Sequence, residues 1–513
     1  MRTKKAIINV CVSCLTYILG FLPAFIVRKI FLVKLGSELL GLSSLFSNII
    51  GYLSLVEMGI GTAIIFSLYR PFAEGDKIKV IGYLNYYRKF YLRVAGIIFI
   101  LGISILPFLK FFISDSMNMN KVKLYFILVL INTIITYLFS YKLCILNVAQ
   151  EGFKIAASNS ISKIIIALMQ YYLLDNFPNF EIYLLIPILI NLVYYLLINI
   201  HINKKYNWLN GMDGKITDEE RYLLGKNIKA LFLHKIGGVI VFGTDNLVIS
   251  KFINLDTVSK FNSYNMIISA IQGIIGTAMT SITSSIGNLL TENDKEKTYK
   301  VHQRIFFINF WIVSLVCITL FNTLTQFIQL WLGKSQVLDN LTINIILINL
   351  YFQLMRGSVE RFKDASGNYY QDRYSSVVES VINLVASVIL VNKIGLPGVF
   401  IGTFLSNILV VFWVKPLITY KYVFNKSVIK YFIMYFKFLL ISLLPLFMTR
   451  VFSRYLNKHI NINMFILNSI INIVIINIIY IIIFRKNKEF LYFKNLIIEK
   501  INNIIKCKER HID

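Results

Sequence analysis

Ionisable side chains occur inside several long apolar stretches of this chain, where a charge that faces lipid is disfavoured by several kcal/mol. The carboxylates among them are Glu57, Asp245 and Glu379, and the basic side chains are Arg28, His234, Lys235, Arg356 and Arg361. A carboxylate in such a place can hold a proton or a cation, whereas arginine and lysine form charge-assisted hydrogen bonds with phosphate. We therefore expect these side chains to face a polar cavity or a partner side chain.

Glu57 and Asp245 each allow two interpretations. Glu57 lies near the middle of the apolar stretch 39–68, and Asp245 lies in the outer half of the stretch 228–252, beside Asn246. Either carboxylate could bind an ion in a cavity, or it could hold neighbouring helices together.

The basic residues of the first and seventh stretches also allow two interpretations. Arg28 lies far along its stretch, after Gly20 and Pro23, and His234 and Lys235 precede a pair of glycines. Long basic side chains near a membrane surface can extend their charge into the interface, which would explain Arg28 and Lys235 without a cavity. Alternatively, at least one of them turns inward to meet an anion.

Charged residues of the tenth and eleventh stretches are spaced by single helical turns. Arg356 and Glu360 are four residues apart, so a local ion pair is expected on one helix face, which leaves Arg361 to meet a phosphate. Glu379 and Asn383 have the same spacing, which places both on one face that could line a cavity.

The composition indicates which elements hold these residues. Of 513 residues, 57% are hydrophobic and 15% are charged, whereas about a quarter of a soluble domain is charged. The mean hydropathy is +0.66. We predict fourteen membrane-spanning helices, at residues 6–30, 39–68, 90–112, 124–148, 155–175, 181–202, 228–252, 262–289, 305–331, 341–360, 374–392, 396–418, 431–450 and 463–484. Because such stretches are apolar on every face, unlike the alternating strands of a barrel, the fold class is an all-α membrane protein.

The positive charge indicates how the chain is oriented. The formal net charge is +27, which in a soluble protein would suggest nucleic acid as a partner, but Lys and Arg gather in alternate connections and in the tail 485–513. By the positive-inside rule, both ends of the chain are expected in the cytoplasm, with a multi-pass protein in the cytoplasmic membrane. The apolar stretch after the N-terminus is expected to stay as the first helix, because it is too long for a cleaved signal sequence. The basic, amphipathic tail either lies on anionic membrane lipids or only fixes the orientation.

The sequence contains none of the motifs that mark a catalytic centre. Metal-ligand spacings, phosphate-binding glycine loops and nucleophile motifs are absent, and the five cysteines are odd in number and mostly inside apolar stretches. The connections are too short to fold into a catalytic domain. We expect no metal, no cofactor and no enzymatic activity, so the function lies among the helices.

A short repeat relates the two halves of the chain. The motif Gly59-Ile60-Gly61-Thr62-Ala63 precedes the charged segment 74–79, and a similar motif at 273–278 precedes the charged segment 292–297. Parallel repeats of this kind are typical of transporters, and in this register Arg28 falls opposite Asp245. The predicted domains are an N-terminal lobe of six helices at 1–203, a cytoplasmic linker at 204–227, a C-terminal lobe of six helices at 228–420, two further helices at 421–484 and the tail at 485–513.

Several segments resemble one family. Residues 33–42, with the sequence VKLGSELLGL, and residues 55–63, with the sequence LVEMGIGTA, resemble the N-terminal signature of the Wzx-like polysaccharide-biosynthesis flippases. These belong to the multidrug/oligosaccharidyl-lipid/polysaccharide (MOP) exporter superfamily. Residues 244–250 and 383–407 resemble the seventh and the eleventh to twelfth helices of that group. Glu57 is a departure, since many relatives carry Asp there.

The resemblance implies two pseudo-symmetric lobes around a central cavity and a flippase function. The expected substrate is a polyprenyl-pyrophosphate-linked oligosaccharide, moved from the inner to the outer leaflet by alternating access for cell-surface polysaccharides such as O-antigen or capsule. Polysaccharide polymerases and glycosyltransferases would then be partners. One alternative is a MATE-like drug antiporter coupled to H⁺ or Na⁺. The other is a membrane polysaccharide polymerase or glycosyltransferase.

Overall fold

The computed structural model consists of helices joined by short turns. It describes residues 19, 22–57, 60–113, 117–149, 151–210, 214–222, 224–225, 244–292, 294–368, 371, 374–458 and 460–509. Nine helices of this part are long and apolar enough to cross a membrane, and no strand occurs in these ranges. The predicted all-α membrane fold is confirmed, while the number of fourteen spans stays a prediction. His234 and Lys235 lie outside the described residues.

Helices of the first half overlap the predicted stretches, although the helix of the third stretch begins at Lys77, thirteen residues before the predicted start at 90. Residues 22–35 are helical and overlap the end of the first stretch. They are followed by α2 (Ser37–Leu53), α3 (Ile60–Glu74), α4 (Lys77–Ile105), α5 (Met119–Phe139), α6 (Leu143–Val148), α7 (Gly152–Asn176) and α8 (Phe180–Lys205). Short 3₁₀ turns are η1 (Ser54–Glu57), η2 (Leu106–Phe111), η3 (Ser140–Lys142) and η4 (Asn207–Asn210).

Helices of the second half agree with the prediction in the same way. Residues 244–252 are helical and form the end of the seventh stretch. The helices that follow are α10 (Leu255–Thr291), α11 (Lys295–Leu332), α12 (Asn340–Ala365), α13 (Ser375–Ile394), α14 (Leu396–Ser406), α15 (Phe412–Ile418), α16 (Ile429–Leu456), α17 (Ile462–Phe484) and α18 (Lys488–Glu509). Between them lie the 3₁₀ turn η5 (Lys334–Gln336) and two π-helical segments, η6 (Asn407–Val411) and η7 (Thr419–Phe424).

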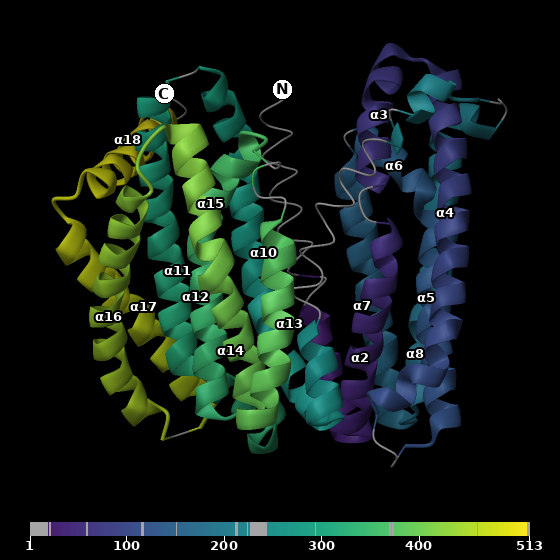
Figure 1. Cartoon of the computed structure of the whole chain (residues 1–513), viewed down its shortest axis with the longest axis horizontal. Helices are drawn as coiled ribbons and strands as arrows, with labels where there is room; N and C mark the ends of the chain where they lie inside the picture. Colours follow the sequence, from purple (N-terminus) through teal and green to yellow (C-terminus); the bar gives the residue numbers. More distant parts are fainter. Residues whose placement is uncertain are drawn as a thin grey trace. The chain divides into compact units, whose positions relative to one another are not determined.

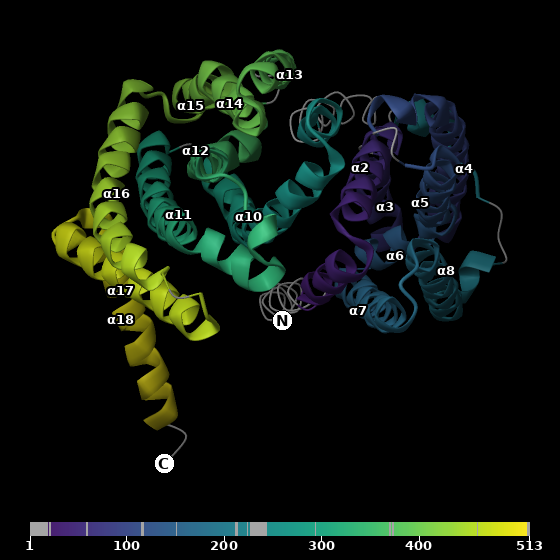
Figure 2. The same cartoon turned by 90° about the horizontal axis from the view of Figure 1, so that it is seen from below.

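Contacts between residues divide the chain into two compact units. Unit 1 comprises Met1–Ala270 and Ser380–Gly402, and unit 2 comprises Ile271–Glu379 and Thr403–Asp513. In unit 1, α4, α5 and α8 run side by side, and α7 packs on α8 (Figures 1 and 2). The core of unit 1 is aliphatic and aromatic, with Phe46 and Phe126 fully buried and their ring centroids 5.2 Å apart.

Unit 2 is built around α11, which contacts α12, α16 and α17 (Figures 1 and 2). Its core contains stacked rings, such as Phe310 and Phe438 with centroids 4.6 Å apart. A buried amide network also joins three helices of the bundle: Asn322 of α11 donates to Thr449 of α16 at 2.9 Å and to Asn472 of α17 at 2.6 Å. Such hydrogen bonds between helices stabilise packing where lipid offers no alternative partner. The amphipathic tail forms α18, which leaves the bundle after α17 (Figure 2).

The internal repeat has a structural counterpart in two helix starts. Asp76 caps α4 by accepting a hydrogen bond from the backbone N–H of Lys79 at 3.0 Å, and Asp294 caps α11 by accepting one from Lys297 at 2.9 Å. The helices that begin at Lys77 and Lys295 are therefore capped in the same way. The predicted lobe boundaries at 203, 228 and 420 stay a prediction.

The second predicted helix is interrupted. The stretch 39–68 was expected to be continuous, but α2 ends at Leu53 and the 3₁₀ turn η1 follows, with Glu57 as its last residue. The hydroxyl of Ser54 donates to the carbonyl of Ile50 at 2.9 Å, a side-chain bond that bends helices because it competes with the backbone ladder. Glu57 thus lies at a break in the second stretch.

Candidate functional site

Arg28 turns inward rather than toward the membrane surface. Its helix face is set by the buried neighbours Val27 and Phe31, which pack into the core of unit 1. The guanidinium Nε donates to Ser263 Oγ at 2.8 Å, and Nη2 donates to the carbonyl of Ser259 at 2.8 Å. Both serines belong to α10 and are fully buried. These two bonds fix the guanidinium and leave some of its five N–H donors for another acceptor.

A cavity of about 370 Å³ lies beside this guanidinium. Its polar lining comes from Arg28, from Lys163 and Gln170 of α7, and from Tyr183 of α8. The Gln170 amide donates to the carbonyl of Tyr183 at 3.1 Å, which fixes that wall. The apolar lining is Ala24, Val27, Leu40, Ile166, Ala167 and Met266. We call this space the Arg28 pocket; it lies wholly within unit 1.

The Arg28 pocket has a positive charge with no counter-charge among the described side chains. Neither Arg28 nor Lys163 forms an ion pair with any residue that the structure describes, and Asp175, further along α7, pairs instead with Lys34 at 3.0 Å. Two cations on one small cavity favour an anion, because their hydrogen bonds to phosphate or carboxylate are charge-assisted. Such a pocket disfavours a cationic ligand for the same reason.

Sequence reasoning missed Lys163. The residue lies near the centre of α7, inside the predicted stretch 155–175, so it is a charge deep in an apolar helix. The rule that selected Arg28 would have selected Lys163 as well. Its nearness to Arg28 could not be predicted, because it depends on how α7 packs against residues 22–35.

Glu57 is held by hydroxyl groups. Tyr91 of α4 donates a short hydrogen bond to Glu57 Oε1, and Tyr87 donates to the Tyr91 hydroxyl at 2.5 Å. A Cβ at Gly61 would lie 3.0 Å from the Tyr87 hydroxyl and 3.9 Å from Glu57 Oε1. The absence of a side chain at Gly61 therefore leaves room for the hydrogen bonds from Tyr87 to Tyr91 and from Tyr91 to Glu57. No described cation pairs with Glu57. A carboxylate bonded only to hydroxyls can take up a proton without breaking an ion pair.

Asp245 lies among polar side chains of unit 1. Its Oδ1 is buried and has no hydrogen-bond partner among the described residues. The neighbouring side chains are bonded: Thr244 donates to Asn383 at 3.4 Å, and the amides of Asn246 and Asn262 bond to each other at 3.0 Å. Arg28, which the repeat register placed opposite Asp245, bonds to Ser263 and Ser259 of α10.

Unit 2 contains a cluster of charges around Glu360. The predicted ion pair between Arg356 and Glu360 is present at 2.8 Å, and Lys415 of α15 pairs with the same carboxylate oxygen at 2.6 Å. Arg356 also donates to Asn407 of η6 at 2.9 Å. Glu379 lies close enough to Arg356 to interact with its charge. Arg356 and Lys415 are thus both paired with a carboxylate, unlike the cations of the Arg28 pocket.

Two residues of this cluster, Lys415 and Asn407, were not among the predicted site residues. Lys415 was missed because it belongs to the twelfth stretch, and only packing brings it to Glu360. The π-helical segment η6, which often marks a functional site, places Asn407 against the Arg356 guanidinium. Arg361 is partly buried, and its Nε has no hydrogen-bond partner among the described residues. No group of metal-ligating side chains occurs in the described ranges.

Comparison with known proteins finds similarity in three-dimensional structure but not in sequence. No protein-family model and no curated protein matches the sequence. The structure is similar to that of the lipid II flippase MurJ in an inward closed conformation, with a TM-score of 0.70 and 17% identity over 94% of this chain and 99% of that one.

Two other solved structures extend this likeness. An inward-facing multidrug resistance MATE family transporter of the MOP superfamily matches with a TM-score of 0.63 and 16% identity, over 79% of this chain and 95% of that one. A MOP superfamily transporter from Pyrococcus furiosus, described by the reverse polarity of its binding pocket, matches with a TM-score of 0.53 and 14% identity over 82% and 96% of the two chains. The chain therefore has the fold of the MOP-type transporters.

Proposed function

We propose that this protein is a flippase that moves a polyprenyl-pyrophosphate-linked oligosaccharide from the inner to the outer leaflet of the cytoplasmic membrane. A transporter with this fold must carry the headgroup of such a lipid across the hydrocarbon core. Each unsatisfied polar group of that headgroup would cost several kcal/mol there, so the protein has to offer hydrogen-bond partners within the membrane.

The Arg28 pocket carries the proposal. Arg28 and Lys163 supply two cations that pair with no carboxylate of the described residues, and Gln170 adds an amide. This chemistry suits the pyrophosphate rather than a cationic drug. The structural likeness to a lipid II flippase agrees with a lipid-linked substrate. The pocket is too small for an oligosaccharide, so we assign it to the phosphates alone.

A second candidate function is an ion-coupled drug antiporter of the MATE type. Two partly buried carboxylates favour it: Glu57, which among the described residues is bonded to hydroxyls, and Asp245, whose Oδ1 has no partner among them. Each could take up a proton or a cation. Solved MATE transporters share this fold.

Flipping in proteoliposomes separates the two functions. Purified protein is reconstituted with a fluorescent polyprenyl-pyrophosphate oligosaccharide, and the fraction in the outer leaflet is followed by chemical quenching. Arg28→Ala and Lys163→Ala should each slow flipping by about tenfold or more, because a hydrogen bond to a charged group contributes about 1.5–3 kcal/mol. Lys29→Ala is the matched control, since its exposed side chain does not line the pocket.

Each result bears on the proposal. Unchanged flipping in both pocket variants, with folded protein, would contradict the role of the Arg28 pocket. Absence of flipping by the unaltered protein, together with proton-driven efflux of a cationic dye, would establish the antiporter instead.

A further inference from the structure

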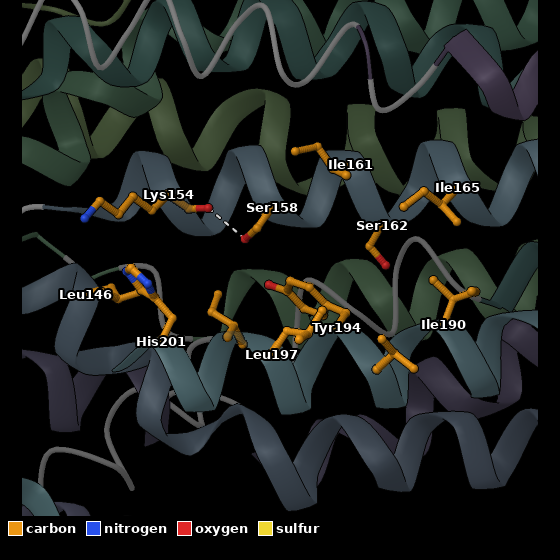
Figure 3. A pocket seen from close by; sticks show the side chains of 12 residues that line it. Leu146, Lys154, Ser158, Ile161, Ser162, Ile165, Ile190, Tyr194, Leu197 and His201 are labelled. Carbon is orange, nitrogen blue, oxygen red and sulfur yellow. Dashed lines mark hydrogen bonds between the residues drawn. The ribbon is translucent and has the colours of Figure 1, made fainter. Parts of the chain in front are cut away.

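A second cavity of unit 1 opens between α7 and α8 and shares no lining residue with the Arg28 pocket. Its volume is about 430 Å³, within the range of about 300–1,000 Å³ that is usual for ligand sites. Figure 3 shows the two helices on either side of it, with Lys154 and His201 at one end and Ile165 and Ile190 at the other. We call it the α7–α8 groove.

The groove exists because small side chains face large ones. On the α7 side Ser158 and Ser162 contribute little volume, whereas Tyr194 and Leu197 form the α8 wall (Figure 3). Apolar side chains form most of the rest of the lining. The Ser158 hydroxyl donates to the carbonyl of Lys154 at 2.7 Å, so it needs no bond from a ligand. The groove thus suits a hydrocarbon chain.

The outward position of α7 makes this cavity accessible from lipid. In the most apolar window of α7, 11% of the residues are buried, the lowest share among the nine candidate spans. Much of this helix therefore lacks a protein neighbour, although the groove beside it is formed by protein on two sides. Inside a membrane, a lipid chain fills such a space.

One end of the groove is basic. Lys154 donates to Glu151 at 3.0 Å, and Lys205 forms a short ion pair with the same carboxylate. Partial burial raises the pKa of Glu151, but hydrogen bonds from Lys205 and Lys154 outweigh this effect and bring the pKa below its usual range. Glu151 is therefore charged, and it occupies one donor of each lysine. Each ammonium has three donors, so both keep N–H groups for another acceptor.

Further cations surround this end. Lys204 is exposed beside Lys205, and Lys142 donates to Asn203 at 2.7 Å. The basic side chains Lys142, Lys154, Lys204 and Lys205 thus outnumber the carboxylate Glu151. Basic clusters at a membrane surface attract anionic headgroups, with about 1 kcal/mol contributed by each Lys or Arg.

The length of the groove fits a single leaflet. Lys154 and Ile165 are eleven residues apart on α7, which corresponds to about 16 Å along a helix. The hydrocarbon core of a bilayer is about 30 Å thick, so one leaflet contributes roughly 15 Å. A chain whose headgroup lies at Lys154 would end near Ile165. The polyprenyl tail of a carrier lipid is longer than one leaflet.

We propose that the α7–α8 groove is a binding site for an anionic phospholipid, with one acyl chain between the helices and the phosphate at Lys154 and His201. The site is separate from the Arg28 pocket and does not depend on the proposed flippase function. It would attach an annular lipid to the face of unit 1 formed by α7 and α8.

Photo-cross-linking in nanodiscs tests this site. Full-length protein is reconstituted with phosphatidylglycerol that carries a diazirine in one acyl chain, and labelled peptides are identified by mass spectrometry. We expect labels on α7 and α8 between Ser158 and Leu197. Lys154→Gln should lower the labelling about fivefold, since one cation near the surface contributes about 1 kcal/mol. Lys77→Gln, which removes an exposed charge of α4 that belongs neither to the lining nor to this basic end, should change it much less.

A second pair of variants tests the shape of the groove. Val193→Trp fills it from α8 and should abolish most of the labelling, whereas Leu189→Trp adds the same ring at an exposed position of α8 outside the lining. Size-exclusion chromatography checks that all variants fold. Equal labelling by phosphatidylcholine and phosphatidylglycerol, or labelling that survives Val193→Trp, would overturn the proposal. So would preferential displacement of the probe by polyprenyl phosphate, which would assign the groove to the carrier lipid.

Discussion

Glu360 is the residue on which the charge cluster of unit 2 depends. Its Oε1 accepts hydrogen bonds from Arg356 and from Lys415. Arg356 is buried, so removal of the carboxylate would leave its guanidinium with Asn407 and the more distant Glu379. A buried charge that loses its partner is costly because neither water nor another group replaces the bond.

We predict that Glu360→Gln lowers the free energy of unfolding by about 3–5 kcal/mol. The measurement is denaturant or thermal unfolding of the purified protein in detergent. Removing the excess cation as well, in the double variant with Lys415→Gln, should restore part of the loss. Glu292→Gln is the control: its pair with Lys297 is about half exposed, and exposed pairs contribute about 1 kcal/mol or less. Equal shifts in the two single variants would contradict the structural role of Glu360.

At the scale of the residue, the sequence was sufficient to predict a contact between two side chains of the same helix. The spacing of Arg356 and Glu360 predicted their ion pair, because residues four apart on a helix are neighbours. It did not predict Lys415 at Glu360, nor Lys163 beside Arg28, because both contacts join helices that are distant in the chain. Tyr91 at Glu57 was missed for the same reason.

At the scale of the element, two helices begin with the same kind of cap. These caps lie in the segments that the internal repeat aligned, and they should contribute to stability. Asp76 and Asp294 each accept a hydrogen bond from the backbone N–H three residues later. Each satisfies one of the four amide groups that a helix start leaves without a partner.

We predict that Asp76→Ala and Asp294→Ala each lower stability by about 1 kcal/mol, since an N-cap Asp contributes roughly that amount. Hydrogen exchange followed by mass spectrometry should show faster exchange in the first turn of α4 in one variant and of α11 in the other. Asp76→Asn is the control, because Asn caps a helix about as well as Asp. Unchanged exchange in either first turn would mean that the cap does not hold that helix.

The contact between α13 and α14 depends on two glycines one helical turn apart. A Cβ at Gly398 would lie 2.4 Å from the carbonyl of Leu390, and a Cβ at Gly402 would lie 2.6 Å from the backbone nitrogen of Ser387. Both obstacles are backbone atoms, which cannot rotate away. This close approach matches the role of small residues spaced by four in membrane helices.

We predict that Gly402→Ala lowers the free energy of unfolding by about 1–3 kcal/mol, the usual cost of overpacking. Gly96→Ala is the matched control, because its Cβ would meet nothing within 4 Å, and alanine favours a helix by up to about 1 kcal/mol over glycine. Thermal unfolding of both variants gives the comparison. A loss of stability in Gly96→Ala as large as in Gly402→Ala would contradict the packing argument.

Helix positions could be predicted because length and hydropathy report directly on a membrane span. Irregular helices could not. The break after Leu53 lies next to the bond between Tyr91 and Glu57, and the π-helical segment η6 accompanies the bond between Arg356 and Asn407. Both irregularities occur where side chains of other helices form hydrogen bonds. The pattern of apolar residues does not predict such contacts between helices.

At the scale of the whole molecule, the two groups of charges differ in whether their cations are paired with a carboxylate. The Arg28 pocket of unit 1 has two cations and no paired carboxylate among the described residues. In unit 2, Arg356 and Lys415 both pair with Glu360, and Glu379 lies close enough to interact with the charge of Arg356. Glu57 adds a carboxylate that, among the described residues, bonds to hydroxyls and to no cation. The first feature suits the export of an anion, and the last suits coupling to a proton, so the energy source of transport distinguishes the two functions.

We predict that a membrane potential, negative on the side from which the lipid leaves, drives flipping of the pyrophosphate-linked substrate. Each negative charge carried across 100 mV gains about 2.3 kcal/mol, which is a factor of roughly fifty in the final distribution. The measurement is leaflet-specific quenching in proteoliposomes with a potassium gradient and valinomycin, compared with a pH gradient at zero potential. Glu57→Gln should leave the response to potential intact and remove any response to the pH gradient. If the pH gradient alone moves the substrate and the potential has no effect, proton exchange is the energy source, and the anion in the Arg28 pocket does not cross the membrane as a net charge.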